Sequence, residues 1–193
     1  MTDLVVKVEE KHKKRLKTAL LFTDFSSAFE GIQAELISKT IELKFDTKEL
    51  KLAKWSTNFI SKKKLMTSDS KRCIELLKAK PEVGSPQGSI LSPCFWLHQA
   101  STSYYQFHKS KEKLLLAKQT ENVSLKGFAD DNCHQISLIR SELGKGKEEL
   151  IKVKQALADT LKVFEDCIEA TGGILNQKKT EYIYHTENKS LEL

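Results

Sequence analysis

The chain has 193 residues, which is enough for one domain with a sizeable hydrophobic core. Its hydrophobic content of 39% and charged content of 30% are typical of a globular protein, and no apolar run is long enough to cross a bilayer. The net charge of +6 favours a polyanionic partner, although many basic proteins bind no nucleic acid.

The first compact apolar run is Thr18–Asp24, which predicts a buried strand with a carboxylate at its C-terminal end. Sites on sheets are often built at that end of a strand. Ser26 or Ser27 can cap a following helix, in which apolar residues from Phe29 to Ile37 recur at helical spacing. Asp24 has a second interpretation as an Asx-turn or helix-capping acid, which is the better one when the residue is taken alone.

A second helix is expected over Thr47–Lys63, with Trp55 facing inward, and Arg72–Leu77 is weakly strand-like. The glycines and prolines of Gly84–Pro93 then predict a tight loop, and Cys94–Phe107 predicts a buried helix. A glycine loop before a helix lets a ligand approach the backbone, and the helix N-terminus favours phosphate. A plain connecting loop explains the same stretch equally well.

In Phe128-Ala129-Asp130-Asp131 the acid pair follows a short apolar run, Val123–Leu125 and then Gly127-Phe128, and precedes another, Ile136–Ile139. The pattern predicts two strands joined by a tight turn that carries the acid pair. Two adjacent carboxylates repel each other unless a cation or proton lies between them, and hard oxygen ligands suit Mg²⁺ or Mn²⁺. An ordinary solvated turn is the alternative, and the tetrapeptide alone favours it.

The C-terminal part predicts an amphipathic helix over Leu150–Ala170, ended by the glycine pair that follows it. Asn176 and Lys179 come next, before a strand at Tyr182–Tyr184. The polar tail, residues 186–193, is expected to be disordered. We see no boundary of a second domain, so residues 1–193 are predicted to be a single domain.

Four stretches in this order resemble the palm motifs A to D of reverse transcriptases, most of all those of non-LTR (LINE-type) retrotransposons. They are Asp24-Phe25-Ser26-Ser27-Ala28-Phe29, Gln87-Gly88-Ser89-Ile90-Leu91-Ser92-Pro93, Phe128-Ala129-Asp130-Asp131, and Asn176 with Lys179-Thr180. The resemblance covers nearly the whole chain and implies an α+β polymerase palm, a small antiparallel sheet (ferredoxin/RRM-like) backed by helices.

The resemblance also implies an RNA-directed DNA polymerase that uses an RNA template, a DNA primer and dNTPs. Asp24 and Asp130 would bind two Mg²⁺ ions, for which Mn²⁺ can substitute, with Asp131 less directly engaged and the Phe25 carbonyl completing a metal shell. The other roles that it implies are sugar selection by Phe29, nucleotide and template contacts by Gln87 and Gly88, and proton donation to pyrophosphate by Lys179. Asn176 would order the last loop.

Three departures from the family pattern affect these expectations. Glu30 stands where the family usually has Asp, and Asn132-Cys133-His134 is more polar than the usual continuation. Fingers and thumb regions do not fit into this chain, so we expect a fragment of a larger polymerase or an inactive, truncated copy. The alternatives are a catalytically dead palm-derived protein that binds nucleic acid, and an RNA-directed RNA polymerase, which the bulky Phe29 opposes.

Overall fold

The computed structural model describes residues 16–26, 28–29, 31–33, 35–37, 39, 51, 54–55, 58, 66–69, 72–75, 84–85, 89–186 and 189–190. The chain divides into two compact units. The first, which we call the sheet unit, takes in the ranges 1–26, 103–170 and 174–193. The second, the hairpin unit, takes in 27–102 and 171–173.

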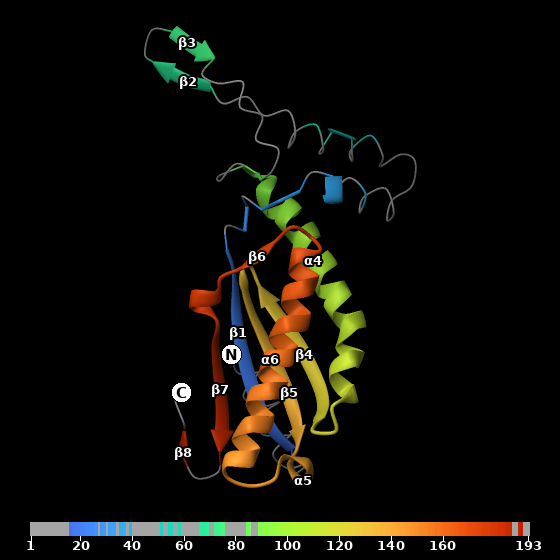
Figure 1. Ribbon diagram of the computed structural model, residues 1–193. Coiled ribbons are helices and arrows are strands. Elements are labelled where there is room, and N and C mark those ends of the chain that lie inside the picture. Colours follow the sequence, from blue (N-terminus) through green and yellow to red (C-terminus); the bar gives the residue numbers. More distant parts are fainter. Residues whose placement is uncertain are drawn as a thin grey trace. The chain divides into compact units, whose positions relative to one another are not determined.

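The sheet unit is built on an antiparallel sheet in the strand order β4-β5-β1-β7-β8, with β6 paired to the end of β1 (Figure 1). Its strands are β1 (Leu16–Ser26), β4 (Thr120–Phe128), β5 (Asp131–Ile139), β6 (Ile174–Leu175), β7 (Glu181–Thr186) and β8 (Lys189–Ser190). The structure confirms the strands predicted at Thr18–Asp24, on both sides of the acid pair and at Tyr182–Tyr184. The fold is the predicted α+β arrangement.

The long central strand β1 has two chemically different faces because neighbouring residues of a strand point in opposite directions. Leu21 and Phe25 share one face with His134 of β5, and both Phe25 and His134 contact the ring of Phe164 in helix α6. We call this the helix face. The opposite face, which carries Asp24, is called the front face.

Helix α6 (Lys147–Glu169) runs along the helix face of the sheet (Figure 1). Its buried residues recur every three or four positions, which is the spacing of one side of a helix. They are Val153, Ala156, Leu157, Thr160, Phe164, Cys167 and Ile168. After the helix, Gly172 adopts a φ of 77°, a left-handed conformation that glycine reaches without steric cost. The helix predicted over Leu150–Ala170 is therefore confirmed and begins three residues earlier.

The core of the sheet unit gathers around the Phe164 ring. Besides Phe25 and His134, this ring contacts Phe107 and Tyr104, with centroids 5.4 and 6.4 Å away. Phe107 and Tyr104 lie in the C-terminal part of α4 (Ser92–Ser110), the helix predicted over Cys94–Phe107. The remaining short elements are α5 (Arg140–Leu143) and 3₁₀ turns at Lys111–Leu116 and Gln177–Lys179.

In the hairpin unit, β2 (Met66–Asp69) pairs with β3 (Arg72–Glu75), which confirms the strand expected near Arg72. In the first predicted helix, residues 35–37 and 39 are helical, but residues 28–29 and 31 form turns and 32–33 are irregular, so the prediction that the helix starts directly after Ser26 or Ser27 is wrong. The described residues of the second predicted helix, such as Trp55, are helical. The prediction that Trp55 faces inward is wrong, because 51% of this residue is exposed, and an indole is too large to be covered easily. Within the described residues, no helix is long and apolar enough to cross a membrane.

Candidate active site

Asp24 and Asp131 are direct cross-strand partners at the end of the β1–β5 ladder. Side chains of directly opposite residues in an antiparallel pair lie on one face with their Cβ atoms about 4.5–5.5 Å apart. Both carboxylates therefore belong to the front face. The two acids, 107 positions apart in the sequence, meet because the register of the pair is fixed by the apolar residues of the helix face.

Asp130 occupies a different position, in the two-residue turn between β4 and β5. Its side chain is exposed, and its backbone oxygen accepts a hydrogen bond of 3.2 Å from the Phe25 N–H. Ala129 beside it has a φ of 54°, which an L-residue other than glycine adopts only at some steric cost. The sequence suggested that the turn brings both acids to one point, whereas the structure places Asp131, at the start of β5, directly across from Asp24.

The front face is hollowed beside the two carboxylates into an open cavity of about 500 Å³. It is lined by residues of β1, the start of β5 and the segment that leads into β7. They are Phe22, Thr23, Asp24, Asp131, Asn132, Lys178, Lys179 and Glu181. The cavity thus combines both signs of charge, with carboxylates from two strands facing the lysines of the 3₁₀ turn.

Lys179 contacts Asp24 directly. Its Nζ lies 2.8 Å from Asp24 Oδ2, and the hydrogen bond and charge of Asp24 raise the pKa of the Lys179 ammonium. The charges of Asp130 and Asp131 raise it further, so this ammonium lies in the field of all three carboxylates. Asn176 places the lysine: its N–H donates to the Asp24 carbonyl (2.8 Å), and its carbonyl accepts from the Lys179 N–H (3.0 Å).

The residues of the cavity fit a hard divalent cation in part. Asp24 and Asp131 supply carboxylate oxygens from adjacent strands to one face, which is the chemistry that Mg²⁺ and Mn²⁺ prefer. Among the described residues, however, no group of three or more His, Cys, Asp or Glu is placed to hold a metal together. The donor set is thus a pair of carboxylates, one of which is already engaged by Lys179.

Two residues not singled out for this role from the sequence, Tyr104 and Asn132, brace the acid turn from the helix face. Tyr104 of α4 donates to Asn132 Oδ1 (2.5 Å), and Asn132 Nδ2 donates to the carbonyls of Asp130 (3.2 Å) and Thr23 (3.5 Å). One amide thereby ties together the backbones of both acid-bearing strands. A side chain on Gly127 would collide with the Tyr104 hydroxyl. The sequence indicated Asn132 only as part of a segment more polar than the usual continuation of the motif.

The side chain of Phe25 does not reach the front face. It is buried on the helix face, 6.3 Å from Phe164 between ring centroids. Its backbone N–H donates to the Asp130 carbonyl, and its own carbonyl is the atom expected to bind a metal. The ligand role itself stays a prediction.

Phe29, Gln87 and Gly88 belong to the hairpin unit, in which Gln87 and Gly88 lie outside the described residues. The start of their loop is attached to the segment that follows β1: the Ser85 N–H donates to the Phe29 carbonyl at 2.6 Å. The hydroxyls of Ser85 and Ser92, 2.5 Å apart, join the two sides of the loop. Phe29 is half-buried, and its expected contact with the sugar stays a prediction.

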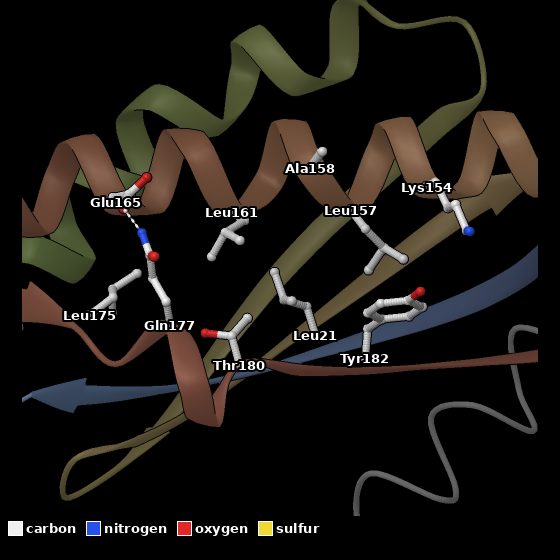
Figure 2. Close-up of a pocket in the computed structure, with 10 residues that line it drawn as sticks. All are labelled: Leu21, Lys154, Leu157, Ala158, Leu161, Glu165, Leu175, Gln177, Thr180 and Tyr182. Carbon is white, nitrogen blue, oxygen red and sulfur yellow. Dashed lines mark hydrogen bonds between the residues drawn. The ribbon is translucent and has the colours of Figure 1, made fainter. Parts of the chain in front are cut away.

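A second hollow, of about 460 Å³, lies on the helix face between α6 and the β1–β7 edge (Figure 2). Leu21, Leu157 and Leu161 point into it, and Gln177 and Glu165 join across one end through a hydrogen bond of 3.4 Å (Figure 2). Leu21 and Asp24 are an odd number of positions apart on β1, so this groove opens on the opposite face from the carboxylates. It is distinct from the candidate active site.

No family model matches this sequence, and no curated protein matches it. Among solved structures, the chain is similar to apo telomerase from Candida tropicalis truncated from its C-terminal domain, with a TM-score of 0.59 and 17% identity over 97% of this chain and 35% of that one. It is also similar to telomerase from Candida tropicalis in complex with a TWJ fragment of telomeric RNA (TM-score 0.60, 18% identity, 97% and 29% coverage).

At these identities the similarity shows the fold alone, a small antiparallel sheet backed by helices as in these telomerase structures. The chain spans about a third of the length of the telomerase chains that it matches.

Proposed function

We propose that this chain is the palm of a reverse transcriptase of the non-LTR retrotransposon class, which adds deoxynucleotides to the 3′-hydroxyl of a DNA primer on an RNA template. The observation that carries the proposal is the cross-strand pair Asp24 and Asp131 on one face of a polymerase-like sheet, beside an open cavity. The motif wording of the sequence supports the retrotransposon class. We also propose that the larger protein of which this palm would be a part has the full polymerase activity.

Asp24 and Asp131 would hold the metal, with Asp130 and the Phe25 carbonyl as further oxygen donors. Two bound Mg²⁺ ions would supply acidification of the primer hydroxyl and neutralisation of the triphosphate charge. Lys179, whose ammonium carries the proton and lies beside Asp24, would donate a proton to the leaving pyrophosphate. The Tyr104–Asn132 brace would keep the carboxylates in register during turnover.

The remaining assignments concern the nucleotide. Phe29 would abut the sugar and exclude a 2′-hydroxyl, and Gln87 and Gly88 would contact the base and template. Equal incorporation of ribonucleotides and deoxyribonucleotides would contradict the role of Phe29 and favour an RNA-directed RNA polymerase.

Primer extension on a primed RNA template, with dNTPs and Mg²⁺ or Mn²⁺, tests the proposal. We expect Asp24→Asn and Asp131→Asn each to lower extension at least about a hundredfold, the scale on which loss of one charge-stabilising group acts. Asp159→Asn is the matched control, because it removes the same charge from helix α6, where Asp159 accepts a hydrogen bond from Gln155. Extension that survives in both site variants would refute the proposal.

A second candidate function is binding of nucleic acid without chemistry. The observation that favours it is the Lys179–Asp24 ion pair, which neutralises one carboxylate of the site internally. Binding of primer–template that weakens steeply with salt, together with no extension by the folded protein, would support this function. Extension that requires Asp24 would exclude it.

A further inference from the structure

The ion pair between Asp24 and Lys179 is asymmetric in its exposure to solvent. The side chain of Asp24 is only 8% exposed, whereas 67% of the Lys179 side chain is exposed. A buried carboxylate needs a partner of opposite charge, because its hydration has been removed. An exposed ammonium on a flexible stem can leave for water at little cost. Asp24 therefore needs the ion pair much more than Lys179 does.

The neighbouring lysine shows that the contact is specific. Lys178 lines the same cavity, yet it forms no ion pair with any described residue. Lys179 is selected by the 3₁₀ turn, in which the Asn176 backbone is bonded to both Asp24 and Lys179. The turn thus delivers one of two adjacent ammonium groups to the carboxylate.

We propose that Lys179 is a displaceable counter-ion, which neutralises Asp24 until a divalent cation binds the carboxylate pair and releases it. This inference rests on the proposed function, because it concerns the same site. The ammonium lies on Asp24 Oδ2, and its positive charge repels a divalent cation that approaches the same carboxylate, so the two cations compete. The released ammonium stays in the cavity on its 3₁₀ turn, where it can meet a phosphate group.

The competition has a measurable size. A divalent cation and an ammonium a few ångströms apart repel each other by an amount worth about tenfold in affinity, even at the dielectric constant of water. Removing the ammonium should therefore tighten metal binding. A lysine that acted only as a proton donor during turnover and did not occupy Asp24 would predict no such gain.

The test is titration of the full chain with Mn²⁺, with free Mn²⁺ measured by electron paramagnetic resonance, and without nucleotide or nucleic acid. We expect Lys179→Gln to bind Mn²⁺ about tenfold more tightly than the wild type, because only this variant removes the competing ion. Lys178→Gln is the matched control: it loses the same charge from the same cavity and should change the affinity much less. Lys179→Arg, which keeps the charge, should bind no more tightly than the wild type.

Unchanged or weaker binding by Lys179→Gln would overturn the inference, and so would an equal gain in Lys178→Gln, which would reveal only a general charge effect. If Lys179→Gln fails to fold, Lys179→Arg decides. Mn²⁺ binding by Lys179→Arg that is tighter than that of the wild type would overturn the inference, and Mn²⁺ binding that is equal or weaker would support it. The proposed function is judged separately by primer extension. Primer extension together with equal Mn²⁺ affinities of the wild type and Lys179→Gln would contradict this inference alone. Tighter Mn²⁺ binding by Lys179→Gln without any primer extension would contradict only the proposed polymerase activity.

Discussion

His134 is expected to make this protein unstable in mild acid. The imidazole is fully buried on the helix face, between Phe107 at 5.2 Å and Phe164 at 4.4 Å, measured between ring centroids. Neither ring nitrogen has a hydrogen-bond partner among the described residues. Burial in these apolar surroundings lowers the pKa of His134 from 6.5 to about 3, because the charged form cannot be hydrated there.

The sign and size of the effect follow from linkage. The unfolded chain binds a proton at His134 below a pH of about 6.5, and the folded chain does not until a pH of about 3, so the free energy of unfolding falls as the pH falls. Between roughly pH 7.5 and pH 4.5 the loss from this one residue is about 2–3 kcal/mol. That is a large share of the stability of a typical domain, about 5–15 kcal/mol.

Urea unfolding at the two pH values measures this loss. His134→Leu should reduce the acid loss by about 2–3 kcal/mol and, because it removes two buried nitrogens without partners, should not destabilise the protein at neutral pH. His108→Gln, at an exposed position of α4, is the matched control and should behave as the wild type does. An acid loss of the same size in the wild type and in His134→Leu would show that His134 is not its source.

Two further predictions concern the acid turn. Gly127→Ala should lower the free energy of unfolding by about 2 kcal/mol, because the new methyl group displaces the Tyr104 hydroxyl from Asn132. Adding Tyr104→Phe to this variant should recover part of the loss. A Gly127→Ala protein as stable as the wild type would show that Tyr104 can move away from the methyl group without cost. Ala129→Gly should raise the free energy of unfolding by about 1 kcal/mol, seen as a higher urea midpoint at unchanged slope, because glycine takes a φ of 54° without strain. A lowered midpoint would mean that the turn is not strained.

Most of the sheet unit could be predicted from local patterns. The apolar run ending at Asp24, the periodic stripe of α6 and the two runs around the acid pair each specify one element, and the structure has those elements. The hairpin strand β2 was not predicted, because Met66–Asp69 has no alternation of apolar and polar residues. The prediction that Trp55 faces inward failed because periodicity identifies the apolar face of a helix but not whether another element covers that face.

The candidate site was predictable in its residue types and less so in its geometry. The motif resemblance implied Asp24 and Asp130 as the main metal ligands, with Asp131 less directly engaged and Lys179 nearby. It did not single out Asp131 as the partner of Asp24, because the cross-strand register that opposes these two residues depends on pairing over more than a hundred positions. The Lys179–Asp24 contact depends on a 3₁₀ turn whose backbone bonds no local pattern specifies. Long-range polar contacts of this kind form only once the sheet is assembled. For that reason the Tyr104–Asn132 hydrogen bond could not be predicted from the sequence.

The most direct measurement for the paired carboxylates is the anomalous diffraction of Mn²⁺ in crystals of the full chain. We expect a Mn²⁺ peak on the front face, about 2.0–2.4 Å from carboxylate oxygens of Asp24 and Asp131, with Lys179 moved away from Asp24. A peak elsewhere, or no peak at saturating Mn²⁺ with the Lys179–Asp24 pair still in place, would contradict it.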